Sequence, residues 1–221
     1  MLSVVIPTLC AAATLPATLA ALAQDADEIV IADGGSTDGT VVLAAGQGAR
    51  IVAAPTGRGL QLAVGAAAAR GDWLLFVHAD TQLAPGWRAV ADRFMAGRED
   101  RLSAGYFHFA LDDDAPAARR LERVVAWRCR RLGLPYGDQG LLMSRTLYDL
   151  VGGYRPIVLM EDVDIVRRLG RARLVALDHV AVTSAARYRH DGYLRRSTRN
   201  LVCVSAWFLG VSPRTIARHY G

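Results

Sequence analysis

Short apolar runs alternate with helix-like stretches along the first 80 residues, and this pattern constrains the fold more than any other feature. The runs at 2–6, 28–32, 50–54 and 73–77 are predicted strands, and the stretches at 11–23, 41–45 and 59–70 are predicted helices. Continuous apolar runs are typical of parallel strands that are buried on both faces. We therefore expect an α/β fold in which helices cover both faces of a mostly parallel sheet.

The alternation loosens in the second half of the chain. Further strands are predicted at 103–111, 141–144, 174–177 and 180–182, and helices at 117–132 and 163–169. The chain has 221 residues, of which 52% are hydrophobic, which is enough for one sizeable core. We expect a single domain over residues 1–221, divided functionally into a part near 1–100 and a part near 101–221.

The formal net charge is +5, and every basic side chain except histidine is an arginine. Positive charge gathers at 119–131 and again from 167 to the end of the chain. The planar guanidinium donates two hydrogen bonds to one anion and therefore suits phosphate. This distribution fits a polyphosphate ligand, nucleic acid or an anionic membrane surface, and it does not choose among them.

The three cysteines have no paired spacing, which argues against a disulfide framework or a zinc ribbon and is compatible with a reducing compartment. The first residues lack the basic start of a signal peptide. The most apolar late segment, 201–211, is too short to cross a bilayer. We therefore expect a cytoplasmic protein.

Polar residues follow the predicted strands at the points where these strands end. Ligands of open α/β sheets bind at the carboxyl ends of strands. Asp33 there can accept hydrogen bonds from a nucleotide base or ribose, or it can simply form a turn with the glycines that follow. Asp80 can bind a hard divalent cation that bridges two phosphates, or it can cap a helix.

Arg58 stands at the start of a predicted helix, where it is a candidate for phosphate or base contact. The surrounding stretch 57–62 lacks the third glycine of a dinucleotide-binding loop, and no acidic residue ends a strand at the required distance after it. We therefore reject a dinucleotide-binding interpretation.

Five segments together carry a family resemblance, and they occur in a fixed order. They are Val4-Val-Ile-Pro-Thr8, Asp33-Gly-Gly-Ser-Thr-Asp-Gly-Thr40, Gly71-Asp-Trp-Leu-Leu-Phe-Val-His-Ala-Asp80, Gly137-Asp-Gln-Gly140 and Met160-Glu-Asp-Val-Asp164. The combination resembles the family 2 inverting glycosyltransferases of GT-A fold, in particular the small soluble bacterial members, over residues 2–170. The resemblance implies a Rossmann-like, mostly parallel sheet flanked by helices, with a C-terminal helical and basic extension.

The resemblance also implies a donor site for a nucleotide-sugar and favours a UDP-sugar. The nucleotide-binding residues would be Pro7, Thr8, Asp33, Gly35, Arg58 and Asp80. Asp80 would also hold Mg²⁺ or Mn²⁺, with His78 as a weaker candidate ligand.

On the acceptor side, the resemblance implies Gly137, Asp138 and Gln139, with Asp162 as the catalytic base and Glu161 beside it. Inversion by single displacement needs one carboxylate to take the proton of the attacking hydroxyl. The plainer interpretation of the pair is an acidic first turn of the helix at 163–169, which favours the helix dipole.

One departure from the family pattern concerns the nucleotide. Related sequences commonly carry an asparagine–glutamate type pair where this chain has Cys10, Ala11 and Ala12. Two alternatives therefore stay open, a catalytically impaired nucleotide-sugar-binding protein and a sugar-phosphate nucleotidyltransferase. The second lacks support, because no glycine-rich basic signature follows the first strand.

The stretch 184–199 interleaves arginines with Tyr188 and Tyr193, and the apolar segment 201–211 follows. One interpretation is a peripheral anchor on the inner face of the membrane, which suits a lipid-linked acceptor. The other is a basic loop that closes over the diphosphate, followed by a packing helix or a homodimer helix. No nucleic-acid partner is expected, because the rest of the chain offers no nucleic-acid-binding motif.

Overall fold

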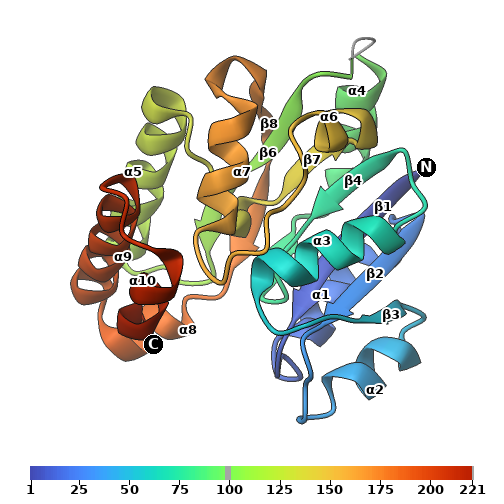
Figure 1. Cartoon of the computed structure of the whole chain (residues 1–221), viewed down its shortest axis with the longest axis horizontal. Coiled ribbons are helices and arrows are strands. Elements are labelled where there is room, and N and C mark those ends of the chain that lie inside the picture. Colours follow the sequence, from blue (N-terminus) through green and yellow to red (C-terminus); the bar gives the residue numbers. More distant parts are fainter. Residues whose placement is uncertain (98–100, 221) are drawn as a thin grey trace.

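The computed structural model describes residues 1–97 and 101–220 and shows one sheet flanked by helices (Figure 1). The strands are β1 (Leu2–Thr8), β2 (Glu28–Asp33), β3 (Arg50–Ala53), β4 (Trp73–Phe76), β5 (Thr81–Leu83), β6 (Ala104–Leu111), β7 (Leu141–Ser144) and β8 (Leu174–Thr183). Their order in the sheet is β3-β2-β1-β4-β7-β6-β8-β5.

The helices follow the strands along the chain. They are α1 (Leu15–Leu22), α2 (Thr40–Gly46), α3 (Arg58–Ala68), α4 (Trp87–Ala96), α5 (Pro116–Leu132), α6 (Arg145–Leu150), α7 (Glu161–Leu169), α8 (Ala186–Asp191), α9 (Tyr193–Phe208) and α10 (Pro213–Tyr220). Two short 3-10 helices, η1 (Gly137–Gln139) and η2 (Arg171–Arg173), complete the described elements.

Strands β1 to β4 are mutually parallel, with β1 between β2 and β4. Strand β7 runs antiparallel to both β4 and β6, whereas β8 runs parallel to β6. The predicted α/β class is confirmed. The strands predicted separately at 174–177 and 180–182 form one strand, β8, and an irregularity in its pairing with β6 lies between Tyr106 and His108.

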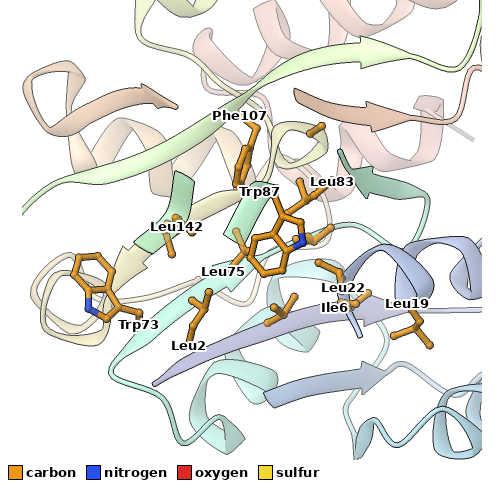
Figure 2. Packing of buried hydrophobic residues seen from close by; sticks show 14 of the residues in the cluster. Leu2, Ile6, Leu19, Leu22, Trp73, Leu75, Leu83, Trp87, Phe107 and Leu142 are labelled. Carbon is orange, nitrogen blue, oxygen red and sulfur yellow. The ribbon is translucent and has the colours of Figure 1, made fainter. Parts of the chain in front are cut away.

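The core lies on both sides of β1, all of whose residues are buried. Leu2 and Ile6 face one cluster, together with Leu19 of α1 and Trp87 of α4 (Figure 2). Val5 faces the other cluster, with side chains of α3 and α7. Successive side chains of a strand point to opposite faces, and here both faces are covered, which explains a continuous apolar run without alternation.

The C-terminal stretch is helical where one interpretation of the sequence expected a basic loop. Residues 186–191 form α8 and residues 193–208 form α9. Tyr188 and Tyr193 stack on each other and pack against the cluster that holds Val125 of α5. This packing stabilises helices that the local run of arginines does not suggest. None of the described helices is long and apolar enough to span a bilayer.

Candidate active site

Two cavities meet at the carboxyl ends of the central strands. The larger has a volume of about 590 Å³ and is lined by the end of β1, the loop after it and the start of α3. The smaller has a volume of about 130 Å³ and is lined by η1, the start of α7 and the inner side of α9. Five residues line both cavities and so form the junction between them: Arg58, His78, Asp80, Ser184 and Arg187.

Asp33 organises the loop after β2. Its carboxylate is 6% exposed and accepts hydrogen bonds from the Thr8 hydroxyl at 2.8 Å, from the Gly35 and Ser36 amides at 3.0 and 2.8 Å, and from the Ser36 hydroxyl. Burial raises the pKa of Asp33, but these hydrogen bonds outweigh it and hold the pKa below its usual value. Pro7 and Thr8 line the larger cavity, whereas Asp33 and Gly35 line neither, so a base contact by Asp33 stays a prediction.

The loop after β2 also fixes the backbone of residues 10–12, the segment that departs from the family pattern. Cys10 has a left-handed backbone, with φ of 50°, and its thiol is exposed. Each backbone amide of residues 10–12 donates to a side chain of the loop: Cys10 to Ser36 Oγ at 2.8 Å, Ala11 to Thr40 Oγ1 at 2.8 Å and Ala12 to Asp38 Oδ2 at 3.0 Å. The segment is therefore held rigidly although its side chains are small.

Gln61 of α3 was not among the predicted site residues. Its buried Nε2 donates to the carbonyl oxygens of Thr8 at 2.6 Å and Ala32 at 3.1 Å, and its Oε1 accepts from the Gly57 amide at 3.3 Å. One amide thus joins the ends of β1 and β2 to the start of α3. A glutamine in a helix of small residues carries no sequence signal of this role.

Arg58 and Glu161 form an ion pair at the junction, with 2.9 Å between Nε and Oε1. The separation is that of an ion pair, but neither carboxylate oxygen accepts a well-aligned hydrogen bond from a described residue. Burial raises the pKa of Glu161 to about 7, with Arg58 opposing and Asp162 adding to the shift. Glu161 was expected in the catalytic pair. Its side chain is fully buried and contacts Arg58, so a direct role of Glu161 in the reaction stays a prediction.

His78 lies against the backbone of η1. A Cβ atom on Gly137 would come within 2.3 Å of its Nε2, so only glycine leaves room for the ring. Burial, followed by the charge of Arg58, lowers the pKa of His78 to about 4, although Asp80 and Asp162 oppose this. The ring is therefore neutral at neutral pH and can serve as a hydrogen-bond partner or a metal ligand.

The two side chains of η1 have different surroundings. Asp138 lines the smaller cavity, and its Oδ1 is buried without a hydrogen-bond donor among the described residues. Burial raises the pKa of Asp138 to about 6, against the opposing charge of Arg128.

Gln139 is only 1% exposed and lines neither cavity. Its Nε2 donates to the Phe107 carbonyl at 3.0 Å, and its Oε1 accepts from the Tyr136 amide at 3.3 Å. The side chain therefore holds η1 on β6, and an acceptor contact by Gln139 stays a prediction.

Asp162 lines the smaller cavity at the start of α7. Its Oδ1 accepts from the Val163 amide at 2.8 Å, and its Oδ2 accepts from the Gly137 amide at 3.1 Å. Two amides from separate elements therefore hold this carboxylate in one orientation beside the junction.

The residues at the junction fit one mode of metal binding. No group of three or more acidic, histidine or cysteine side chains within the described ranges is arranged as a cage for a metal ion. Mg²⁺ typically needs no such cage, because it binds one or two carboxylates together with substrate phosphates and water. Asp80 lines both cavities and supplies such a carboxylate.

Comparison with known proteins bears on the family and the fold of the chain. Residues 3–100 match the model of the family described as Glycosyl transferase family 2. This match agrees with the resemblance seen in the motifs of this part of the chain. A PGL/p-HBAD biosynthesis glycosyltransferase of Mycobacterium bovis (strain BCG / Pasteur 1173P2) is 42% identical over 93 residues, covering 38% of this chain and 36% of the relative. The similarity thus spans about a third of that relative's length.

Solved structures show the same fold over most of the chain. Glucosyl-3-phosphoglycerate synthase from Mycobacterium tuberculosis, in complex with Mn²⁺, UDP and glucosyl-3-phosphoglycerate, has a TM-score of 0.56 and 20% identity, covering 91% of this chain and 78% of that one. S. aureus TarS 1–349 has a TM-score of 0.63 and 15% identity, covering 92% and 64%. The fold is therefore that of the GT-A glycosyltransferases.

Proposed function

We propose that the chain transfers a sugar from a UDP-sugar to the hydroxyl of an acceptor, with inversion at the anomeric carbon. One observation carries the proposal: Arg58, Asp80 and Arg187 stand where the two cavities meet, and Asp162 lines the smaller one. A donor in the larger cavity and an acceptor in the smaller would react at this junction. The UDP and Mn²⁺ complexes of the similar synthase support the choice of nucleotide and metal.

The side chains on the donor side suit a diphosphate. Arg58 and Arg187 line the junction, where guanidinium groups suit phosphate oxygens. Asp80 would hold Mg²⁺ or Mn²⁺, whose charge would stabilise the diphosphate as it leaves. Pro7 and Thr8 line the part of the larger cavity that would receive the nucleoside.

The acceptor side supplies the base. Asp162 is held by the Gly137 and Val163 amides in the cavity that would receive the acceptor hydroxyl. A bond forms between the acceptor oxygen and the anomeric carbon, the bond from that carbon to the diphosphate oxygen breaks, and Asp162 takes the hydroxyl proton. The carboxylate needs no second acid, because the diphosphate leaves as an anion.

One specific observation favours a second candidate, a protein that binds the nucleotide-sugar without turning it over. Cys10 and Ala11 line the larger cavity where related sequences commonly carry an acidic residue. Without that carboxylate, the pocket loses a hydrogen-bond acceptor for the nucleotide.

The first test is isothermal titration of UDP and of GDP into the protein, with and without Mn²⁺. We expect metal-dependent binding of UDP that is lost in Asp80→Ala and kept in Asp178→Ala, since Asp178 is exposed on β8 and lines neither cavity. Metal-dependent binding of GDP alone would overturn the choice of UDP. Absence of binding by either nucleotide to the folded protein would overturn the proposal as a whole.

A further inference from the structure

One face of α5 combines arginines with exposed apolar side chains. Trp127 is 52% exposed, although indole side chains are usually mostly buried. Residues three, four or seven positions from it share its side of the helix. With Trp127 they form what we call the α5 face: Arg120, Arg123, Val124, Trp127, Arg130 and Arg131, all of them exposed.

The positive charge of the α5 face is not neutralised within the described structure. The single acidic residue of α5, Glu122, is turned away from this face. Its Oε2 pairs with Arg119 at 2.8 Å, and its Oε1 accepts from the Leu111 amide at 2.9 Å. None of the four arginines of the α5 face forms an ion pair with a described carboxylate. The face therefore presents four guanidinium groups around one tryptophan.

Helix α9, which lies next to α5, carries an exposed apolar row of its own. Figure 1 shows α5 and α9 together at the end of the molecule opposite β3 and α2, and Tyr193 of α9 packs with the cluster that holds Val125 of α5. Leu194, Leu201 and Phe208 are all exposed and lie seven residues apart, so they share one side of α9, although the Phe208 ring also has the Arg167 guanidinium 5.0 Å from its centroid. Leu194 is 82% exposed. The opposite side of α9 carries the buried Cys203 and packs on the body of the protein.

We propose that the α5 face and the outer side of α9 bind the surface of a bilayer rich in anionic lipid. Helices that lie in a membrane interface carry arginine or lysine together with tryptophan, phenylalanine and leucine. The arginines of the α5 face would contact lipid phosphates, Trp127 would enter the head-group region, and the row on α9 would rest on the acyl boundary. This contact does not depend on the proposed transfer reaction.

Two other partners fit the surface less well. A nucleic acid would match the arginines, but it offers nothing to Val124, Leu194 or Leu201, which are aliphatic and exposed. A second copy of the chain would match the apolar side chains, but pairing two α5 faces would bring eight arginines together without acids between them. A charged bilayer matches both features at once.

The test is co-sedimentation of the full chain with phosphatidylcholine vesicles, with or without one quarter phosphatidylglycerol. We expect binding to the anionic vesicles only. Each arginine near such a surface contributes about fivefold to the partition coefficient, so the double variant Arg120→Gln, Arg131→Gln should bind about 25-fold more weakly. The matched control Arg70→Gln, Arg93→Gln removes the same charge from two exposed positions away from α5 and α9, in the loop after α3 and in α4, and should bind like the native protein.

Fluorescence shows where the contact lies. Brominated anionic vesicles should quench the native protein, and Trp127→Ala should reduce that quenching, because Trp73 and Trp87 are buried in the core and Trp207 of α9, the remaining tryptophan, is half-buried. Equal loss of binding in both double variants would overturn the proposal. So would absence of binding to anionic vesicles, binding to an oligonucleotide in place of vesicles, or a stable dimer that Trp127→Ala dissociates. Circular dichroism of each variant confirms that it is folded.

Discussion

The Nε atom of Arg58 lies 2.9 Å from Oε1 of Glu161, and this pair joins the first turn of α3 to the first turn of α7. Arg58 also lines both cavities, and Glu161 directly precedes Asp162. One ion pair therefore connects the part of the fold that would hold the donor with the part that would hold the base.

Replacing Glu161 by Gln should change how stability depends on pH. Burial raises the pKa of Glu161 from 4.5 to about 7, so the folded protein binds the proton more tightly than the unfolded chain. The stability that this group contributes is complete below pH 4.5 and is lost as pH rises to about 7. The loss is on the order of 3 kcal/mol. Urea unfolding from pH 4.5 to 8 should show the variant gaining about this amount relative to the native protein. If the stabilities of the variant and the native protein depended on pH in the same way, the raised pKa of Glu161 would be contradicted.

Replacing Asp162 by Asn should reduce kcat by about 10² to 10⁴ without weakening UDP binding, because the amide keeps the shape but cannot take the proton. The measurement is release of UDP from a UDP-sugar in the presence of an acceptor, with titration of UDP in parallel. Asp178→Asn, on the exposed part of β8, should keep the native rate. A variant at position 162 with native turnover would exclude this residue as the base.

Replacing Gly59 by Ala should destabilise the start of α3. The added Cβ would lie 2.3 Å from the Arg155 carbonyl oxygen and 2.7 Å from that of Ile157, so backbone must move. We expect a loss of about 3 kcal/mol by urea unfolding. Gly46→Ala, at the last residue of α2, is the matched control, since its Cβ would meet nothing within 4 Å. It should be neutral or stabilise by up to about 1 kcal/mol. Equal effects of the two substitutions on stability would show that the backbone carbonyls near Gly59 leave room for a Cβ atom.

Replacing Gln61 by Leu should cost about 2 kcal/mol in stability, because the carbonyls of Thr8 and Ala32 each lose the Gln61 donor, although the Thr8 carbonyl keeps the Gly34 amide at 2.8 Å. UDP affinity should fall as well, since Gln61 lines the larger cavity. Thermal unfolding and UDP titration measure the two effects. Gln82→Leu, at an exposed position of β5, should change neither. Unchanged UDP affinity in a destabilised Gln61 variant would argue against a nucleotide site there.

Cys10 should react with a thiol reagent faster than the other two cysteines. Its thiol is exposed, whereas Cys129 and Cys203 are buried, and burial raises the pKa of both. UDP with Mn²⁺ should slow labelling of Cys10 at least about tenfold, because this residue lines the larger cavity. Cys10→Ser should remove the fast phase. Labelling that UDP does not slow would place the nucleotide elsewhere.

The sequence by itself determined the parallel half of the sheet and which residues lie together at its edge, where the candidate site was predicted. The apolar runs that form β1, β2 and β4 belong to strands of the sheet interior, where both faces are covered. Such strands can be predicted from the sequence alone. Residues that end neighbouring parallel strands must lie at one edge, so Thr8, Asp33 and Asp80 were predicted near one another from their positions alone.

Only the tertiary structure decided what several of these residues do. Glu161 and Gln139 were predicted as site residues, and the structure shows both side chains buried. Gln61 was not predicted as a site residue, yet its side chain joins three elements. A helical C-terminal extension was already expected from the sequence, but the contacts of Tyr188 and Tyr193 with the cluster of α5 are seen only in the structure. The physical reason is common to all of them. The role of a polar side chain depends on burial and on partners tens of residues away, and local patterns of residue type do not encode those contacts.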